Sequence, residues 1–133
     1  MKTLLVSAAL LIDEKGRILL AQRPEGKSLA GMWEFPGGKV EPDESPELAL
    51  IRELKEELAI EVDAVDIKPL TFVVHPYNHF RLLMLLYHCR HWQGAPQGLE
   101  GQALRWISLA EIDALPLPPA DKPLVEYLRK NFK

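Results

Sequence analysis

Residues 37–58 of the chain read GGKVEPDESPELALIRELKEEL, and they predict a loop followed by a helix. Ser45 is a favoured N-cap, and Pro46 suits the first helical position. Leucines then recur at helical spacing as far as Leu58. We therefore expect a glycine-containing loop and an α-helix over residues 46–58.

One face of this helix is acidic. At about 100° per residue, Glu53, Glu56 and Glu57 fall within about a third of the helix circumference. The other side is predicted to be apolar and buried, and consists of Leu48, Leu50, Ile51, Leu54 and Leu58. The three carboxylates would then share one space.

Two interpretations of the acidic face are open. Like charges three or four residues apart repel by a few tenths of a kcal/mol when solvated, so a solvated face is the usual meaning of E-x-x-E-E alone. A divalent cation would also relieve the repulsion, since hard cations such as Mg²⁺ take oxygen ligands and substrate phosphates. The surrounding pattern decides between them.

The spacing G-x5-E-x7-R-E-L-x-E-E, from Gly38 through Glu44 to Glu57, resembles the signature of the Nudix hydrolases. The resemblance implies an α+β fold, a Nudix-type α/β/α sandwich with a mixed β-sheet, as one domain over residues 1–133. One position departs from the signature. Ala59 stands where a glycine would take the left-handed turn that ends the helix, so the sequence leaves the exact end of the helix open.

The resemblance implies a role for each matching residue. The metal ligands would be Glu53, Glu56 and Glu57, with a backbone carbonyl from Gly37 or Gly38. The cation would be Mg²⁺, for which Mn²⁺ substitutes. Glu53 is also a candidate for the general base, or for a ligand of the metal that activates water. Arg52 and Glu44 would form a pair that holds the loop against the helix.

Four flanking segments resemble the MutT branch of the family, which contains 8-oxo-dGTP diphosphatases and similar CTP pyrophosphohydrolases: residues 21–24, 31–39, 98–102 and 117–121. This likeness implies attack at the β-phosphorus of a triphosphate such as 8-oxo-dGTP, giving a nucleoside monophosphate and pyrophosphate. Three alternatives remain: a CTP or dCTP pyrophosphohydrolase, a hydrolase of nucleoside diphosphates linked to another group, such as ADP-ribose, and a non-enzymatic nucleotide-binding module.

The same likeness assigns phosphate and metal contacts outside the helix. Arg23 would bind phosphate, with help from Lys39; the alternative is a surface charge at a strand end. Glu100 would complete the metal site or act as the base, although a loop glutamate is more often plain surface.

Base recognition would involve two residues. Phe35 is a candidate to stack on the base, although a phenylalanine at a strand end is more often part of the core. Asp121 would accept hydrogen bonds from N–H groups of the base, such as the cytosine amino group or N7–H of 8-oxoguanine. Asp121 also suits the N-cap of the last helix.

The remaining elements follow from hydrophobic patterns and turn residues. Strands are expected over residues 4–12, 17–23, 62–74, 80–92 and 104–107, with a short extended piece at 33–35. A short helix capped by Ser108 and a final helix over 121–131 complete the chain. This order predicts a mixed sheet with helices on its faces.

Composition limits the partners. The 133 residues are 47% hydrophobic and 26% charged, as in one ordinary globular domain. The net charge of −3 argues against polymeric nucleic acid, and no apolar stretch reaches the roughly 20 residues of a membrane span. A single cysteine fits a reducing compartment. We expect a cytoplasmic monomer or weak homodimer with a nucleoside triphosphate substrate.

Overall fold

The computed structural model describes residues 1–132. Its elements in chain order are β1 (Lys2–Leu11), β2 (Ile18–Gln22), β3 (Trp33–Glu34), β4 (Gly37–Lys39), α1 (Pro46–Leu58), the 3-10 helix η1 (Ala64–Asp66), β5 (Lys68–Pro76), β6 (Phe80–Cys89), β7 (Leu104–Ile107), the 3-10 helix η2 (Leu109–Ala114) and α2 (Asp121–Asn131).

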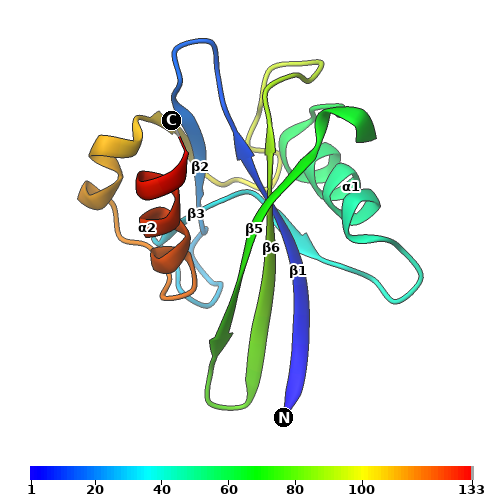
Figure 1. Cartoon of the computed structure of the whole chain (residues 1–133), viewed down its shortest axis with the longest axis vertical. Coiled ribbons are helices and arrows are strands. Elements are labelled where there is room, and N and C mark those ends of the chain that lie inside the picture. The colour runs from blue at the N-terminus through cyan, green and yellow to red at the C-terminus, as the bar shows by residue number, and fades with distance from the viewer. Residues whose placement is uncertain (133) are drawn as a thin grey trace.

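The strands form two sheets between the helices. The larger sheet has the order β4-β1-β6-β5 and is mixed, because β1 runs parallel to β6 while the other pairs are antiparallel. The smaller sheet, β3-β2-β7, is antiparallel. Helix α1 lies on one side of the strands, and α2 with η2 lies on the other (Figure 1). The predicted α/β/α sandwich with a mixed sheet is confirmed.

Strand β1 supplies both halves of the core, because successive side chains of a strand point to opposite faces. Leu11 belongs to the cluster that contains Leu54 of α1. Leu10 belongs to the cluster that contains Leu124 of α2. Helix α1 is therefore fixed to the centre of the sheet by a buried apolar contact.

Helix α1 begins as predicted and buries Leu50, Leu54 and Leu58 as expected, but not Leu48. The Ser45 hydroxyl accepts a hydrogen bond from the Leu48 N–H (3.2 Å). Leu48, which was predicted to be buried, is 57% exposed. Seven residues fall about 20° short of two turns, so Glu57 lies nearly in line with Leu50. The expectation that the glutamates lie opposite the leucines is wrong, since Glu53 and Glu57 flank the sheet-facing side.

Ala59 closes the helix without distortion. It adopts the left-handed conformation (φ 59°, ψ 30°), and its N–H donates to the Lys55 carbonyl (3.1 Å). The helix end that the sequence left open is therefore a regular left-handed cap. An alanine accepts the steric cost of this conformation where the signature has glycine.

Several predicted boundaries differ. Residues 64–66 form η1, so β5 begins at Lys68, and β6 ends at Cys89. A continuous apolar run does not mark its own ends, because its periodicity is ambiguous. Ser108 precedes η2, but its hydroxyl bonds to the Glu111 carboxylate (2.7 Å) and caps no backbone N–H. Within residues 1–132, no helix is long and apolar enough to cross a membrane.

Candidate active site

The two glycines of β4 let three segments approach closely. Gly37 pairs with Ala8 and Gly38 pairs with Ser7 of β1, so this segment is a strand where a loop was expected. A Cβ on Gly37 would collide with the backbone of Ser7 and Ala8, and a Cβ on Gly38 would collide with the Glu53 carboxylate. Glycine at position 37 lets β4 pair closely with β1, and glycine at position 38 leaves the space that the Glu53 carboxylate occupies.

Arg52 ties the loop before α1 to the helix. Its Nη2 and Nε donate to the two carboxylate oxygens of Glu44 (2.6 and 3.1 Å). Nη2 also donates to the Lys39 carbonyl (3.1 Å), and a Glu44 oxygen accepts from the Glu41 N–H (3.0 Å). The hydrogen bond from Arg52 lowers the pKa of Glu44, which remains ionised. The planar guanidinium fixes this geometry by its bidentate contact.

Glu57 is the most perturbed carboxylate of the site. Burial, followed by the charges of Glu53, Glu100 and Glu34, raises the pKa of Glu57 to about 8, and the Gly37 N–H offsets only part of this. Its Oε2 is buried and has no hydrogen-bond partner within residues 1–132. A buried carboxylate beside other carboxylates is costly unless a cation compensates it.

Glu53 shares this environment, whereas Glu56 does not. The Glu53 side chain is 18% exposed, and burial raises its pKa while Arg52 opposes the change. The Glu56 side chain is 55% exposed and lies 3.3 Å from Arg52 Nη1. Glu100 lies in an exposed loop, yet its charge raises the pKa of both Glu53 and Glu57. These carboxylates come from two segments about forty residues apart in sequence.

The residues fit a divalent cation by their chemistry. All the candidate donors are oxygens, one is buried without a partner, and Gly38 leaves the approach to Glu53 free of side-chain atoms. As arranged, no group of three or more acidic, histidine or cysteine side chains in residues 1–132 is close enough to hold a metal ion. Glu53 and Glu57 are therefore the best-placed ligands, and Glu56 would need to rotate away from Arg52 to join them.

Arg23, one of the two predicted phosphate-binding residues, pairs with Glu34, for which no role was predicted. Arg23 Nη1 donates to both carboxylate oxygens of Glu34 (3.1 and 2.8 Å), and its Nε donates to the Ser28 carbonyl (2.7 Å). Lys39 is exposed on β4. The negative charge of Glu34 also raises the pKa of Glu57. Glu34 therefore interacts with both the predicted phosphate contact Arg23 and the predicted metal ligand Glu57. Its only sequence signal is its position beside Phe35 in a MutT-like segment.

Phe35 takes the core role that the sequence left open, and Asp121 does not take the predicted N-cap role. Phe35 is 4% exposed and belongs to the core cluster under α2, so its ring packs in the core and presents no open face for stacking. Asp121 is not the N-cap of α2, because Ala120 holds that position and no side chain caps the helix. Helical backbone already includes Asp121, and its side chain points inward, where it is 1% exposed.

Asp121 is buried without a partner for one oxygen. Its Oδ2 has no hydrogen-bond partner within the described residues. Burial, and then the charge of Glu34, raises the pKa of Asp121 to about 7, while the Phe35 N–H and Arg23 lower it. Burial, and also the charge of Asp121, raises the pKa of the Tyr77 hydroxyl. Such a group has unused hydrogen-bonding capacity for a ligand.

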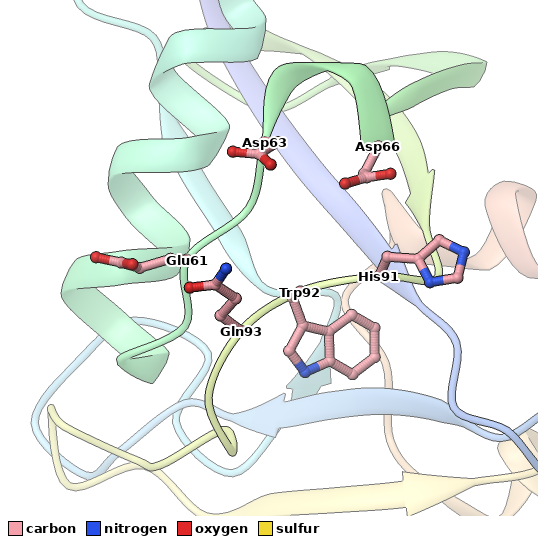
Figure 2. A pocket seen from close by; sticks show the side chains of 6 residues that line it. All are labelled: Glu61, Asp63, Asp66, His91, Trp92 and Gln93. Carbon is pink, nitrogen blue, oxygen red and sulfur yellow. The ribbon is translucent and has the colours of Figure 1, made fainter.

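A depression of about 250 Å³ lies elsewhere and includes none of the predicted site residues (Figure 2). Three carboxylates, a histidine, a tryptophan and a glutamine surround it: Glu61, Asp63, Asp66, His91, Trp92 and Gln93. It lies between the segment that follows α1 and the segment that follows β6. The predicted metal and phosphate site therefore lies outside this depression.

Comparisons with known proteins agree with the motif. The family model described as "NUDIX domain" matches residues 7–127. The CTP pyrophosphohydrolase of Escherichia coli (strain K12) is 45% identical over 129 residues, which cover 95% of this chain and 91% of that protein. The 8-oxo-dGTP diphosphatase of the same organism is 34% identical, over 98% of this chain and 99% of that protein. The solution structure of the E. coli ORF135 protein superposes with a TM-score of 0.83 at 43% identity, covering 97% of this chain and 92% of that one.

Proposed function

This chain belongs to the NUDIX domain family, and we propose that it is a Mg²⁺-dependent hydrolase that converts a nucleoside triphosphate to the monophosphate and pyrophosphate. Nudix hydrolases act on phosphoric anhydrides of nucleotides and generally need a divalent metal. The choice of Mg²⁺, with Mn²⁺ as a substitute, follows from the all-oxygen donor set.

One observation carries the proposal. The Glu57 carboxylate is buried with an unpartnered oxygen beside Glu53 and within reach of the Glu100 charge. Buried polar groups in folded proteins almost always have a hydrogen-bond partner, so an unpartnered buried carboxylate oxygen supports a bound cation as its partner. Glu53, Glu57 and Glu100 would hold the metal, and Glu56 would join them after leaving Arg52.

When bound, divalent metal neutralises phosphate charge and makes a bound water more acidic. Side chains of the protein would accept the proton, bind the phosphate chain and position the site. The Glu53 carboxylate, which lies 3.4 Å from Arg52 Nη1, would accept the proton of the attacking water or ligate the metal that activates that water. Arg23 would bind the phosphate chain when its guanidinium turns from Glu34 toward the substrate. Arg52 and Glu44 would hold the glycine-containing strand in register with the helix.

We propose 8-oxo-dGTP as the first candidate substrate, by similarity to the 8-oxo-dGTP diphosphatases. Cytidine triphosphates are the second candidate, for two reasons. The relative named CTP pyrophosphohydrolase has the higher identity. Asp121 also offers an acceptor that suits the amino group of cytosine. Removal of oxidised nucleotides from the pool would be the biological role under the first candidate, which a mutation-rate assay in a strain lacking the protein tests.

A substrate panel tests the proposal. The protein is incubated with Mg²⁺ and 8-oxo-dGTP, dGTP, CTP, dCTP or ADP-ribose, and pyrophosphate is separated from orthophosphate and from monophosphates. Glu57→Gln serves as the matched control for contaminating phosphatases. We expect pyrophosphate from at least one triphosphate and none from the Glu57→Gln protein. Two monophosphates from ADP-ribose, without pyrophosphate from any triphosphate, would instead support a diphosphate-linked substrate.

A further inference from the structure

The loop that joins β6 to β7 lies against the C-terminal end of α1. The last carbonyls of a helix have no partner within the helix. Here the Gln97 N–H donates to the Leu58 carbonyl (2.9 Å), and the Leu99 N–H donates to the Glu57 carbonyl (3.0 Å). The loop that carries Glu100 therefore caps the helix that carries Glu57.

The Gln102 side chain connects the Glu100 loop to the end of α1. Its Nε2 donates to the Glu57 carbonyl (3.1 Å), and its Oε1 accepts from the Glu100 N–H (2.8 Å). Both ends of the side-chain amide are thus used. Gln102 is 9% exposed, although Leu99, Glu100 and Gly101 beside it are exposed. One buried side chain joins the backbones of two residues whose carboxylates belong to the proposed metal site.

The surrounding loop leaves little space for another arrangement. A Cβ on Gly98 would collide with the Gln102 carbonyl, so the turn closes tightly around Gln102. Glu100 has no helix or strand of its own to hold it. A ligand on an exposed loop reaches its working position only part of the time unless a second group fixes its backbone.

We infer that Gln102 is a positioning residue, which sets the Glu100 carboxylate relative to Glu57 and Glu53 through its two hydrogen bonds. The inference rests on the proposed function, because it assigns Gln102 a task within that site. Groups behind metal ligands contribute about 10- to 100-fold to metal affinity or activity in other proteins. We expect Gln102 to lie at the lower end of this range, since backbone contacts such as the Leu99 N–H also hold the loop.

The test uses Gln102→Met, which keeps the length of the side chain and removes both hydrogen bonds. Gln97→Met is the matched control, because Gln97 is exposed in the same loop and its side chain makes no hydrogen bond within residues 1–132. Gln102→Glu keeps the acceptor for the Glu100 N–H and replaces the methionine variant if that variant does not fold. Circular dichroism and thermal unfolding check the fold of each.

Three readouts are compared: kcat, Mn²⁺ affinity by titration, and hydrogen exchange of the Glu100 amide. For Gln102→Met we expect kcat to fall about tenfold, Mn²⁺ affinity to fall, and the Glu100 amide to exchange faster. In a Glu100→Gln background the same change should lower kcat by less than about twofold, since both changes act on one group. Gln97→Met should behave as the wild type.

A full tenfold loss in the Glu100→Gln background, or wild-type behaviour of Gln102→Met, would overturn the inference. The two failures can be told apart. If Glu57→Gln abolishes activity while Gln102→Met leaves it intact, only the role of Gln102 fails. If Glu57→Gln is itself fully active, the proposed function and this inference fail together.

Discussion

Replacing Asp121 by asparagine should stabilise the protein in a pH-dependent way. Asp121 is 1% exposed, and burial, with the Glu34 charge, raises the pKa of Asp121 from its ordinary 3.8 to about 7. Between these values the folded protein keeps a proton that the unfolded chain releases. Unfolding is therefore favoured increasingly as pH rises from 3.8, and the effect is complete above about 7.

The size of the effect follows from the two pKa values. Each unit of difference corresponds to about 1.36 kcal/mol, so the wild type loses up to about 4 kcal/mol of stability from this group between pH 4 and pH 8. An amide does not titrate in this range. The stability gained by Asp121→Asn over the wild type should therefore increase by 2 to 4 kcal/mol over the same interval, as an order of magnitude. A constant cost of burying the amide would cancel in this comparison.

The assay is urea unfolding at pH 4, 6 and 8 in the presence of EDTA, followed by tryptophan fluorescence. Asp43→Asn is the control, because Asp43 is exposed. A difference between Asp121→Asn and the wild type that changes by less than about 1 kcal/mol from pH 4 to pH 8 would refute the reasoning. It would mean that Asp121 is ionised in the folded protein throughout.

Three further changes test other parts of the structure. Ala59→Gly should raise the free energy of unfolding by about 0.5–1 kcal/mol, because glycine adopts φ 59° without the steric cost that alanine meets. Urea unfolding measures this difference, and an unchanged or lower stability would contradict the prediction. Gly38→Ala should weaken Mn²⁺ binding about 10- to 100-fold, because the new Cβ displaces the Glu53 carboxylate; wild-type affinity in a titration would show that Glu53 is not a ligand. Arg52→Lys should lower kcat/KM about tenfold, because an ammonium cannot hold both Glu44 oxygens and the Lys39 carbonyl. The circular dichroism spectrum should not change. Full activity of the variant would show that Arg52 has no positioning role.

Much of the fold was predictable from local signals. The start of α1 and the strand at 104–107 are marked by a cap, turns and periodicity that act over a few residues. The ends of β5 and β6 were not predictable, because an apolar run does not indicate where strand pairing stops. The two-sheet arrangement depends on long-range pairing, such as β1 with β6, which no local pattern specifies.

The site was predictable where a motif spans it. The spacing from Gly38 to Glu57 placed the glycine strand, the Arg52–Glu44 pair and the acidic side of α1 together. The sequence could not indicate how deeply each glutamate is buried, because that depends on how α1 rolls against the sheet. Phe35 is a core residue for the same reason. Glu34 and Gln102 carry no distinctive pattern, and only their contacts to Arg23 and Glu57 reveal them.

In the proposed function, carboxylates of α1 bind divalent cations that bridge to a nucleotide's phosphates. The most direct measurement is a Mn²⁺ titration, by the loss of the free-ion electron paramagnetic resonance signal, of the wild type and Glu57→Gln, with and without a non-hydrolysable triphosphate. We predict saturable binding by the wild type that the triphosphate strengthens, and affinity at least about tenfold weaker in Glu57→Gln. Equal Mn²⁺ affinity in the two proteins would contradict the account.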